Sequence, residues 1–295
     1  MKEPIFTGSG VALVTPFNET GVDYDKLSEM LEFHIAHKSD SLAICATTGE
    51  SAAMSLEEHC DVLKFCSEKV HGRITLIAGT GSNDTSSAVL LSKYAEQVGY
   101  DGLLLVTPYY NKTTQKGLKK HFGVLAESVS IPIILYNIPG RTGMSISMDT
   151  FKYLDKTYPN INGVKEATGN VALAAQICAE TELNVYSGND DIIVPIMSVG
   201  GKGVISVVAN ILPDETHDIC ADYMNGDVEK SRKQFLGMLD LIHALFIEVN
   251  PIPIKTAMNL LGYNVGKLRM PLCDMEEENL EKLKASLVNA GLKLK

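Results

Sequence analysis

The sequence lacks a surplus of positive charge and any pair of cysteines at CxxC spacing. Its formal net charge is −10 at pH 7, which argues against binding to nucleic acid, because sequence-independent binding needs a basic surface. The six scattered cysteines are typical of reduced thiols in a cytosolic protein rather than of a disulfide framework. We therefore expect a cytoplasmic protein that does not bind nucleic acid.

Long apolar runs and common catalytic motifs are also missing. The first residues hold no apolar stretch of signal-peptide length, and no run of about 18 apolar residues offers a membrane span. HExxH, GxSxG and the P-loop motif are absent. His34 and His37 have no third ligand at zinc spacing. We expect no metal, no cofactor and no membrane partner.

The chain instead alternates short apolar segments with amphipathic ones. The expected strands are residues 10–17, 41–46, 74–78, 103–106, 131–135, a sixth around Lys165, 184–186 and 203–208. Such alternation indicates parallel strands joined by helical crossovers. Eight units within about 225 residues predict a (β/α)8 TIM barrel. A doubly wound open sheet is the alternative, but no GxGxxG follows the first strand.

The alternation stops near Asp227. Apolar residues then recur at helical spacing in three segments up to the last residues of the chain. We expect residues 1–226 to form the barrel that carries the active site. Residues 227–295 are expected to form a C-terminal helical region packed on that barrel.

Polar residues follow the expected strands where a barrel of this type has its active site, at the carboxyl ends. Each has an ordinary interpretation, as a turn threonine, a core tyrosine or a solvated arginine. Their convergence on one end of the barrel favours a functional site. They are Thr47, Thr48, Tyr109, Tyr110, Tyr136, Arg141, Lys165 and Gly188.

Lys165 is the unusual residue, because it sits in an apolar strand. Desolvation disfavours the ammonium form, and a neutral lysine amine forms a Schiff base with a carbonyl substrate. The alternative is an ordinary lysine that extends its head into water. Schiff-base chemistry also needs a proton relay, for which Thr47, Tyr110 and Tyr136 offer hydroxyls. Arg141 offers a bidentate partner for a carboxylate.

Five segments resemble the dihydrodipicolinate synthase family of pyruvate-dependent class I aldolases. They are residues 47–51, 107–111, 136–143, 163–170 and 203–206. The resemblance implies a barrel with a helical C-terminal region, assembled as a homotetramer of tight dimers. It implies condensation of pyruvate with L-aspartate 4-semialdehyde on the route to diaminopimelate and lysine. No cofactor is implied.

The resemblance also assigns roles in the reaction. Lys165 would form the Schiff base with pyruvate, and Tyr136 would move protons to and from the substrate. Thr47 would link Tyr136 to Tyr110, which in this family reaches across the dimer interface.

The remaining implied roles concern binding. Thr48 would hold the carboxylate of pyruvate, and Arg141 would hold that of the semialdehyde. Gly188 and the carbonyl of Ile205 would line the site. N-acetylneuraminate lyases lack this arginine and usually have serine in place of Thr47. Aldolases for N-acetylneuraminate or 2-keto-3-deoxygluconate remain the alternative within the superfamily, and a non-catalytic keto-acid sensor is the alternative outside it.

Two departures from the family pattern affect regulation and the turn beside the site. Lysine-inhibited bacterial members carry histidine and glutamate in an allosteric cleft, where this chain has Leu56 and Ser87. The other cleft residues are retained: Ser51, His59, Asn83 and Tyr109. Weak or absent inhibition by lysine is therefore expected. Ala46 stands where the family often has glycine.

Overall fold

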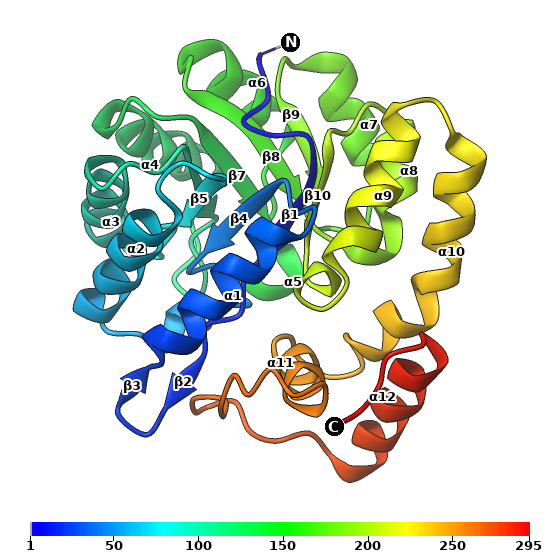
Figure 1. Ribbon diagram of the computed structural model, residues 1–295. Coiled ribbons are helices and arrows are strands. Elements are labelled where there is room, and N and C mark those ends of the chain that lie inside the picture. The colour runs from blue at the N-terminus through cyan, green and yellow to red at the C-terminus, as the bar shows by residue number, and fades with distance from the viewer. Residues whose placement is uncertain (1) are drawn as a thin grey trace.

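The computed structural model describes residues 2–295, and its centre is a closed barrel of eight parallel strands. β1 pairs with both β4 and β10, which closes the barrel (Figure 1). The predicted fold is thus confirmed. The strands are β1 (Gly8–Ala12), β4 (Ser41–Ile44), β5 (Thr75–Gly79), β6 (Gly102–Val106), β7 (Ile133–Asn137), β8 (Ile161–Glu166), β9 (Asn184–Ser187) and β10 (Gly203–Ser206).

Helices surround the barrel and bury their apolar faces on its strands. Several begin where the sequence supplies a capping side chain: Asp23, Ser55 and Asn170 each accept a backbone N–H in the first turn. The helices of the barrel are α1 (Tyr24–Ala36), α2 (Leu56–Val70), α3 (Thr85–Gln97), α4 (Gln115–Ser128), α5 (Pro139–Thr142), α6 (Met148–Thr157), α7 (Val171–Glu180), α8 (Ile193–Ser198) and α9 (Pro213–Met224), with short 3-10 turns η1 (Ser51–Ala53), η2 (Asp190–Ile192) and η3 (Val208–Asn210).

The first strand is shorter than the predicted 10–17. β1 ends at Ala12, and a small antiparallel pair of strands, β2 (Phe17–Asn18) and β3 (Gly21–Val22), follows. Pro16 has no N–H to donate to a neighbouring strand, so the barrel pairing does not extend through it. The N–H of Phe17 instead donates to the carbonyl of Val265 in the C-terminal region.

Aromatic rings fill the barrel interior. The rings of Phe6 and Tyr186 stack with centroids 4.5 Å apart, and the Tyr186 hydroxyl donates to the Phe6 carbonyl at 2.8 Å. Gly163 leaves the space that this arrangement needs: a Cβ there would lie 2.6 Å from the carbonyl oxygen of Asn184 and 3.3 Å from the Tyr186 ring. Side chains placed above this layer are therefore shielded from below.

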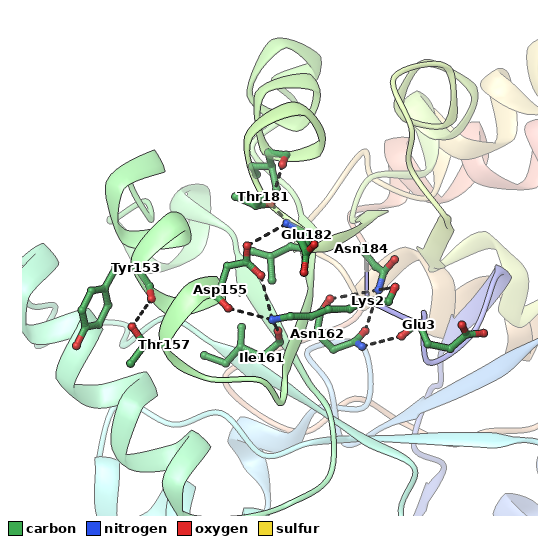
Figure 2. Close-up of polar contacts among 12 residues, drawn as sticks. Lys2, Glu3, Tyr153, Asp155, Thr157, Ile161, Asn162, Thr181, Glu182 and Asn184 are labelled. Atoms are coloured by element: carbon green, nitrogen blue, oxygen red, sulfur yellow. Dashed lines mark hydrogen bonds and ion pairs between the residues drawn. The ribbon is translucent and has the colours of Figure 1, made fainter.

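The N-terminal segment closes the end of the barrel where the strands begin (Figure 2). The Lys2 amine donates to the carbonyl of Ile161 at 2.6 Å and lies 3.0 Å from a carboxylate oxygen of Asp155. The side-chain amide of Asn162 donates to the Glu3 carbonyl at 2.8 Å, and that of Asn184 donates to the Lys2 carbonyl at 3.2 Å. These contacts cover the end of the barrel where β8 and β9 begin, opposite the end where the predicted site residues follow the strands.

The predicted C-terminal helical region consists of α10 (Val228–Ala244), α11 (Ile252–Leu260) and α12 (Glu277–Asn289). α10 packs on α9 and α12, and α11 packs on α12. In Figure 1, α11 and α12 lie together in orange and red, at the opposite end of the molecule from the N-terminus. No helix among residues 2–295 combines the length and the apolar character needed to cross a bilayer.

A buried ion pair joins this region to the barrel. The Lys255 amine lies 2.7 Å from a carboxylate oxygen of Glu50, and both side chains are 1% exposed. The same amine donates to the carbonyl of Thr15 at 3.1 Å, and the other Glu50 oxygen accepts the backbone N–H of Arg269 at 2.9 Å. Burial lowers the pKa of Lys255, and the charge of Glu50 opposes that effect.

Glu50→Gln tests the ion pair. The substitution leaves a buried ammonium group without its counter-charge, so we expect the free energy of unfolding to fall by about 3 kcal/mol. Urea denaturation measures this loss. Adding Lys255→Met should recover most of it, whereas Glu29→Gln, in the exposed Lys26–Glu29 pair, should change little. If Glu50→Gln alone is as stable as the parent protein, the ion pair does not hold the C-terminal helical region on the barrel.

Candidate active site

Lys165 lies inside the open end of the barrel, on β8, and is 4% exposed. Burial lowers the pKa of its amine to about 8; the charge of Asp190 opposes this effect and the charge of Arg141 adds to it. With such a pKa, roughly a tenth of the amine is neutral at pH 7. A neutral lysine amine is the form that can attack a carbonyl carbon, which is the role predicted for Lys165.

Tyr136 lies directly beside this amine. It is the register partner of Lys165 on β7, and the two side chains enter the barrel from the same face of the sheet. The Lys165 nitrogen is 4.4 Å from the centroid of the Tyr136 ring. Burial raises the pKa of Tyr136 to about 12, although the charge of Arg141 and a hydrogen bond with Thr47 lower it. The phenol thus stays protonated and can donate a proton to a neighbouring oxygen.

Strained turns hold the Thr47-Thr48 pair. Cys45 and Glu50, on either side of it, adopt positive φ angles of 55° and 54°, which is costly for residues with a Cβ. Gly79 on β5 permits the close approach, because a Cβ there would lie 2.4 Å from the Cys45 carbonyl oxygen. The methyl group of Ala46, uncertain from the sequence alone, packs in the barrel interior.

Asn250 connects two of the predicted binding residues. The side-chain amide of Asn250 donates to the hydroxyl of Thr48 at 3.0 Å. The backbone carbonyl of Asn250 accepts from the Arg141 guanidinium at 2.7 Å. Asn250 lies in the C-terminal region, so the site is not built from the barrel alone. The Asn-Pro pair marks a turn between helices, but that signal does not indicate that the turn reaches the barrel mouth.

Tyr110 is the predicted relay residue that this chain does not bring to the site. It is 91% exposed, with a positive φ of 63°, and it does not line the cavity that contains Tyr136. Its neighbour Lys112 also has a positive φ, of 50°.

A cavity of about 410 Å³ opens at this end of the barrel. It reaches from Thr47, Tyr136 and Arg141 to the predicted allosteric cleft. Ser51, His59 and Tyr109 line it, together with Leu56 and Ser87.

Besides Tyr110, five predicted residues within the described chain do not line this cavity: Thr48, Lys165, Gly188, Ile205 and Asn83. Gly188 packs against the loop that follows Lys165: a Cβ atom added to Gly188 would lie 2.6 Å from the Cβ atom of Ala167. Ile205 belongs to the barrel interior next to Tyr136. Asn83 accepts a hydrogen bond at its carbonyl from Asn111, at 2.9 Å.

The dihydrodipicolinate synthetase family model matches residues 5–290. This chain belongs to that family. It is 57% identical over 293 residues to the 4-hydroxy-tetrahydrodipicolinate synthase of Acetivibrio thermocellus, covering 99% of this chain and 100% of the relative. The family and the enzyme class predicted from the sequence are confirmed.

Solved structures of the family agree. The dihydrodipicolinate synthase of Aquifex aeolicus superposes with a TM-score of 0.97 at 44% identity, over 98% of this chain and 100% of that one. The enzyme of Acinetobacter baumannii, solved with pyruvate, has a TM-score of 0.94 at 41% identity, over 97% and 99% of the two chains.

Asn250→Ala tests the link to the C-terminal region. The variant loses the donor to Thr48 but keeps the carbonyl that accepts from Arg141. We expect the KM for the keto acid to rise roughly tenfold, the equivalent of one hydrogen bond, with kcat and the unfolding midpoint little changed. Steady-state kinetics measure this, with the exposed Asn225→Ala as control. An unchanged KM would mean that Asn250 does not orient Thr48.

Proposed function

We propose that this chain catalyses the condensation of pyruvate with L-aspartate 4-semialdehyde, as a 4-hydroxy-tetrahydrodipicolinate synthase. The observation that carries the proposal is the Lys165 amine, buried against the Tyr136 ring with its pKa lowered to about 8. Relatives above 50% identity over nearly the whole chain carry this name, which supports the choice of substrates. The reaction belongs to the route to diaminopimelate and lysine.

The chemistry begins at the Lys165 nitrogen. Its lone pair attacks C2 of pyruvate, and the resulting carbinolamine loses water to give an iminium ion. Loss of a C3 proton then gives an enamine, whose C3 attacks the aldehyde carbon of the semialdehyde. Each step moves a proton, and the Tyr136 phenol, hydrogen-bonded with Thr47, is placed to carry it.

The charges at the mouth favour a substrate with a carboxylate near its reacting carbon. Arg141 lies close enough to lower the pKa values of both Lys165 and Tyr136. A guanidinium there suits the carboxylate of the semialdehyde, whereas a sugar acid offers hydroxyls at that distance. Thr48 is assigned to the carboxylate of pyruvate.

A substrate panel with covalent trapping tests the proposed reaction. We expect borohydride with pyruvate to add mass at Lys165, and Lys165→Ala to abolish the adduct. With pyruvate present, the semialdehyde should be consumed at least a hundredfold faster than N-acetylneuraminate or 2-keto-3-deoxygluconate is cleaved. A faster sugar-acid reaction would contradict the substrate assignment, and the absence of an adduct would favour a keto-acid sensor.

Tyr110 is assigned to the active site of a neighbouring subunit. Its exposure and strained backbone support an arrangement in which two subunits exchange this residue and complete the relay through Thr47. We infer a homotetramer of such tight dimers in the cytoplasm. The barrel is assigned to residues 1–226 and its helical appendage to residues 227–295, which contributes Asn250 to the site.

Lysine should inhibit this enzyme weakly or not at all. Among the described residues, those that line the cavity include no carboxylate to pair with a lysine ammonium group. The Ser87 hydroxyl donates to Asp84 at 2.6 Å, and burial lowers the pKa of His59 to about 4, so its imidazole is neutral.

We expect an inhibition constant for lysine above roughly 1 mM, a value at which binding supplies only about 4 kcal/mol. Initial-rate measurements with and without lysine give the constant. The double variant Leu56→His with Ser87→Glu restores an imidazole and a carboxylate, and it should bind lysine at least tenfold more tightly. Micromolar inhibition of the parent enzyme would contradict this account of the cleft.

A further inference from the structure

Asp190 is a buried carboxylate at the mouth of the barrel to which the reaction above gives no part. It begins η2, directly after β9, and is 2% exposed. One oxygen, Oδ2, accepts the backbone N–H groups of Val207 and Val208 at 2.9 and 3.0 Å, in the segment after β10. The other, Oδ1, is buried and has no hydrogen-bond partner among residues 2–295. An unsatisfied carboxylate oxygen is costly inside a protein.

The electrostatic partner of Asp190 is the Lys165 amine. Asp190 follows β9, which pairs with β8 so that Tyr186 is the register partner of Lys165, and the N–H of Gly188 donates to the carbonyl of Glu166 at 2.8 Å.

The Tyr136 ring lies beside the Lys165 amine, and the charges of Asp190 and Arg141 act on it. Of the two charges, that of Asp190 raises the pKa of Lys165 and that of Arg141 lowers it. Burial raises the pKa of Asp190, and a hydrogen bond with the Ser206 side chain, the two backbone N–H groups and the charge of Lys165 oppose this effect.

We propose that Asp190 is a positioning residue whose negative charge stabilises the iminium ion formed on Lys165. The inference rests on the proposed function. The attacking amine is neutral, whereas the iminium nitrogen is positive, so a fixed buried carboxylate favours the second state over the first.

This preference affects the first of two steps. When the carbinolamine takes up a proton and loses water, the nitrogen lone pair forms the C=N bond and the positive charge develops beside Asp190. When the C3 proton leaves, its electron pair forms the C2–C3 double bond and the iminium nitrogen accepts the displaced pair. Asp190 therefore promotes the capture of pyruvate as the iminium ion, whereas loss of the C3 proton, which removes the positive charge, gains nothing from this stabilisation.

Asp190→Asn removes the charge and keeps an oxygen that accepts from Val207 and Val208. Borohydride trapping of the pyruvate adduct, followed by intact mass across a pH series, gives the midpoint of Lys165 reactivity. We expect this midpoint to fall by about one pH unit, because a nearby opposite charge shifts a pKa by one unit or more. The pyruvate concentration for half-maximal trapping should rise about tenfold, since one pKa unit corresponds to about 1.4 kcal/mol.

Two variants keep the result interpretable. Asp191→Asn changes the charge equally at the next, exposed residue and should leave the midpoint unchanged. Asp190→Glu keeps the charge and should stay within a few tenths of the parent midpoint even if it is less stable. If Asp190→Asn does not fold, Asp190→Ser, which keeps a hydroxyl acceptor, is judged by the same midpoint.

A lowered kcat with an unchanged midpoint would overturn the inference, since it would reveal a purely structural role for the two backbone hydrogen bonds. Absence of any adduct on the parent enzyme is a different outcome, because it would contradict the proposed function itself.

Discussion

The structure depends on the desolvation of one amine. The barrel keeps water away from Lys165, and the aromatic side chains of the barrel interior, among them its register partner Tyr186 on β9, contribute to that shielding. Phe6 and Tyr186 stack inside the barrel, and the N-terminal segment closes the end below them through Lys2 and Asn162. The contacts of Lys2 and Asn162 lie where β8 begins, whereas Lys165 lies near the end of that strand.

Two opposing charges then modify the pKa of the Lys165 amine, which burial has lowered. Arg141 and burial favour the neutral form, and Asp190 favours the charged one. The balance places the pKa of Lys165 at about 8, near the value that serves both a nucleophile and a cationic intermediate. Tyr136 stays protonated in the same environment, so the amine and its proton donor are prepared by one physical cause.

The C-terminal helical region contributes contacts to the candidate active site. Glu50, which anchors Lys255, lies two residues after Thr48 in a strained turn. Asn250 holds Thr48 directly and supports Arg141 through its carbonyl. Fixing both ends of the turn keeps the threonine hydroxyls in place relative to Tyr136.

The sequence was sufficient to predict the barrel and to place Lys165, Tyr136 and Thr47 together at one end of it. The strand–helix alternation predicts parallel strands, and their carboxyl ends converge, so polar residues at those ends had to meet. The resemblance to a known family then assigned their chemistry.

The sequence did not reveal the contacts of Asn250 and Lys255 or the burial of Asp190. Asn250 and Lys255 reach their partners across more than 200 residues, and no local periodicity encodes such contacts. Asp190 resembled any acidic residue in a loop until its burial was known. Tyr110 differs from these residues: the sequence singled it out, but in the single chain its side chain is exposed.

The most direct test of the account is the protonation of the Lys165 amine itself. Titration of ε-¹³C-labelled lysine by NMR, with Lys165→Ala to assign the signal, follows this amine in the absence of substrate. The account predicts a midpoint near pH 8. A midpoint near 10.4, the value of a lysine in water, would show that the amine is solvated and would contradict the mechanism.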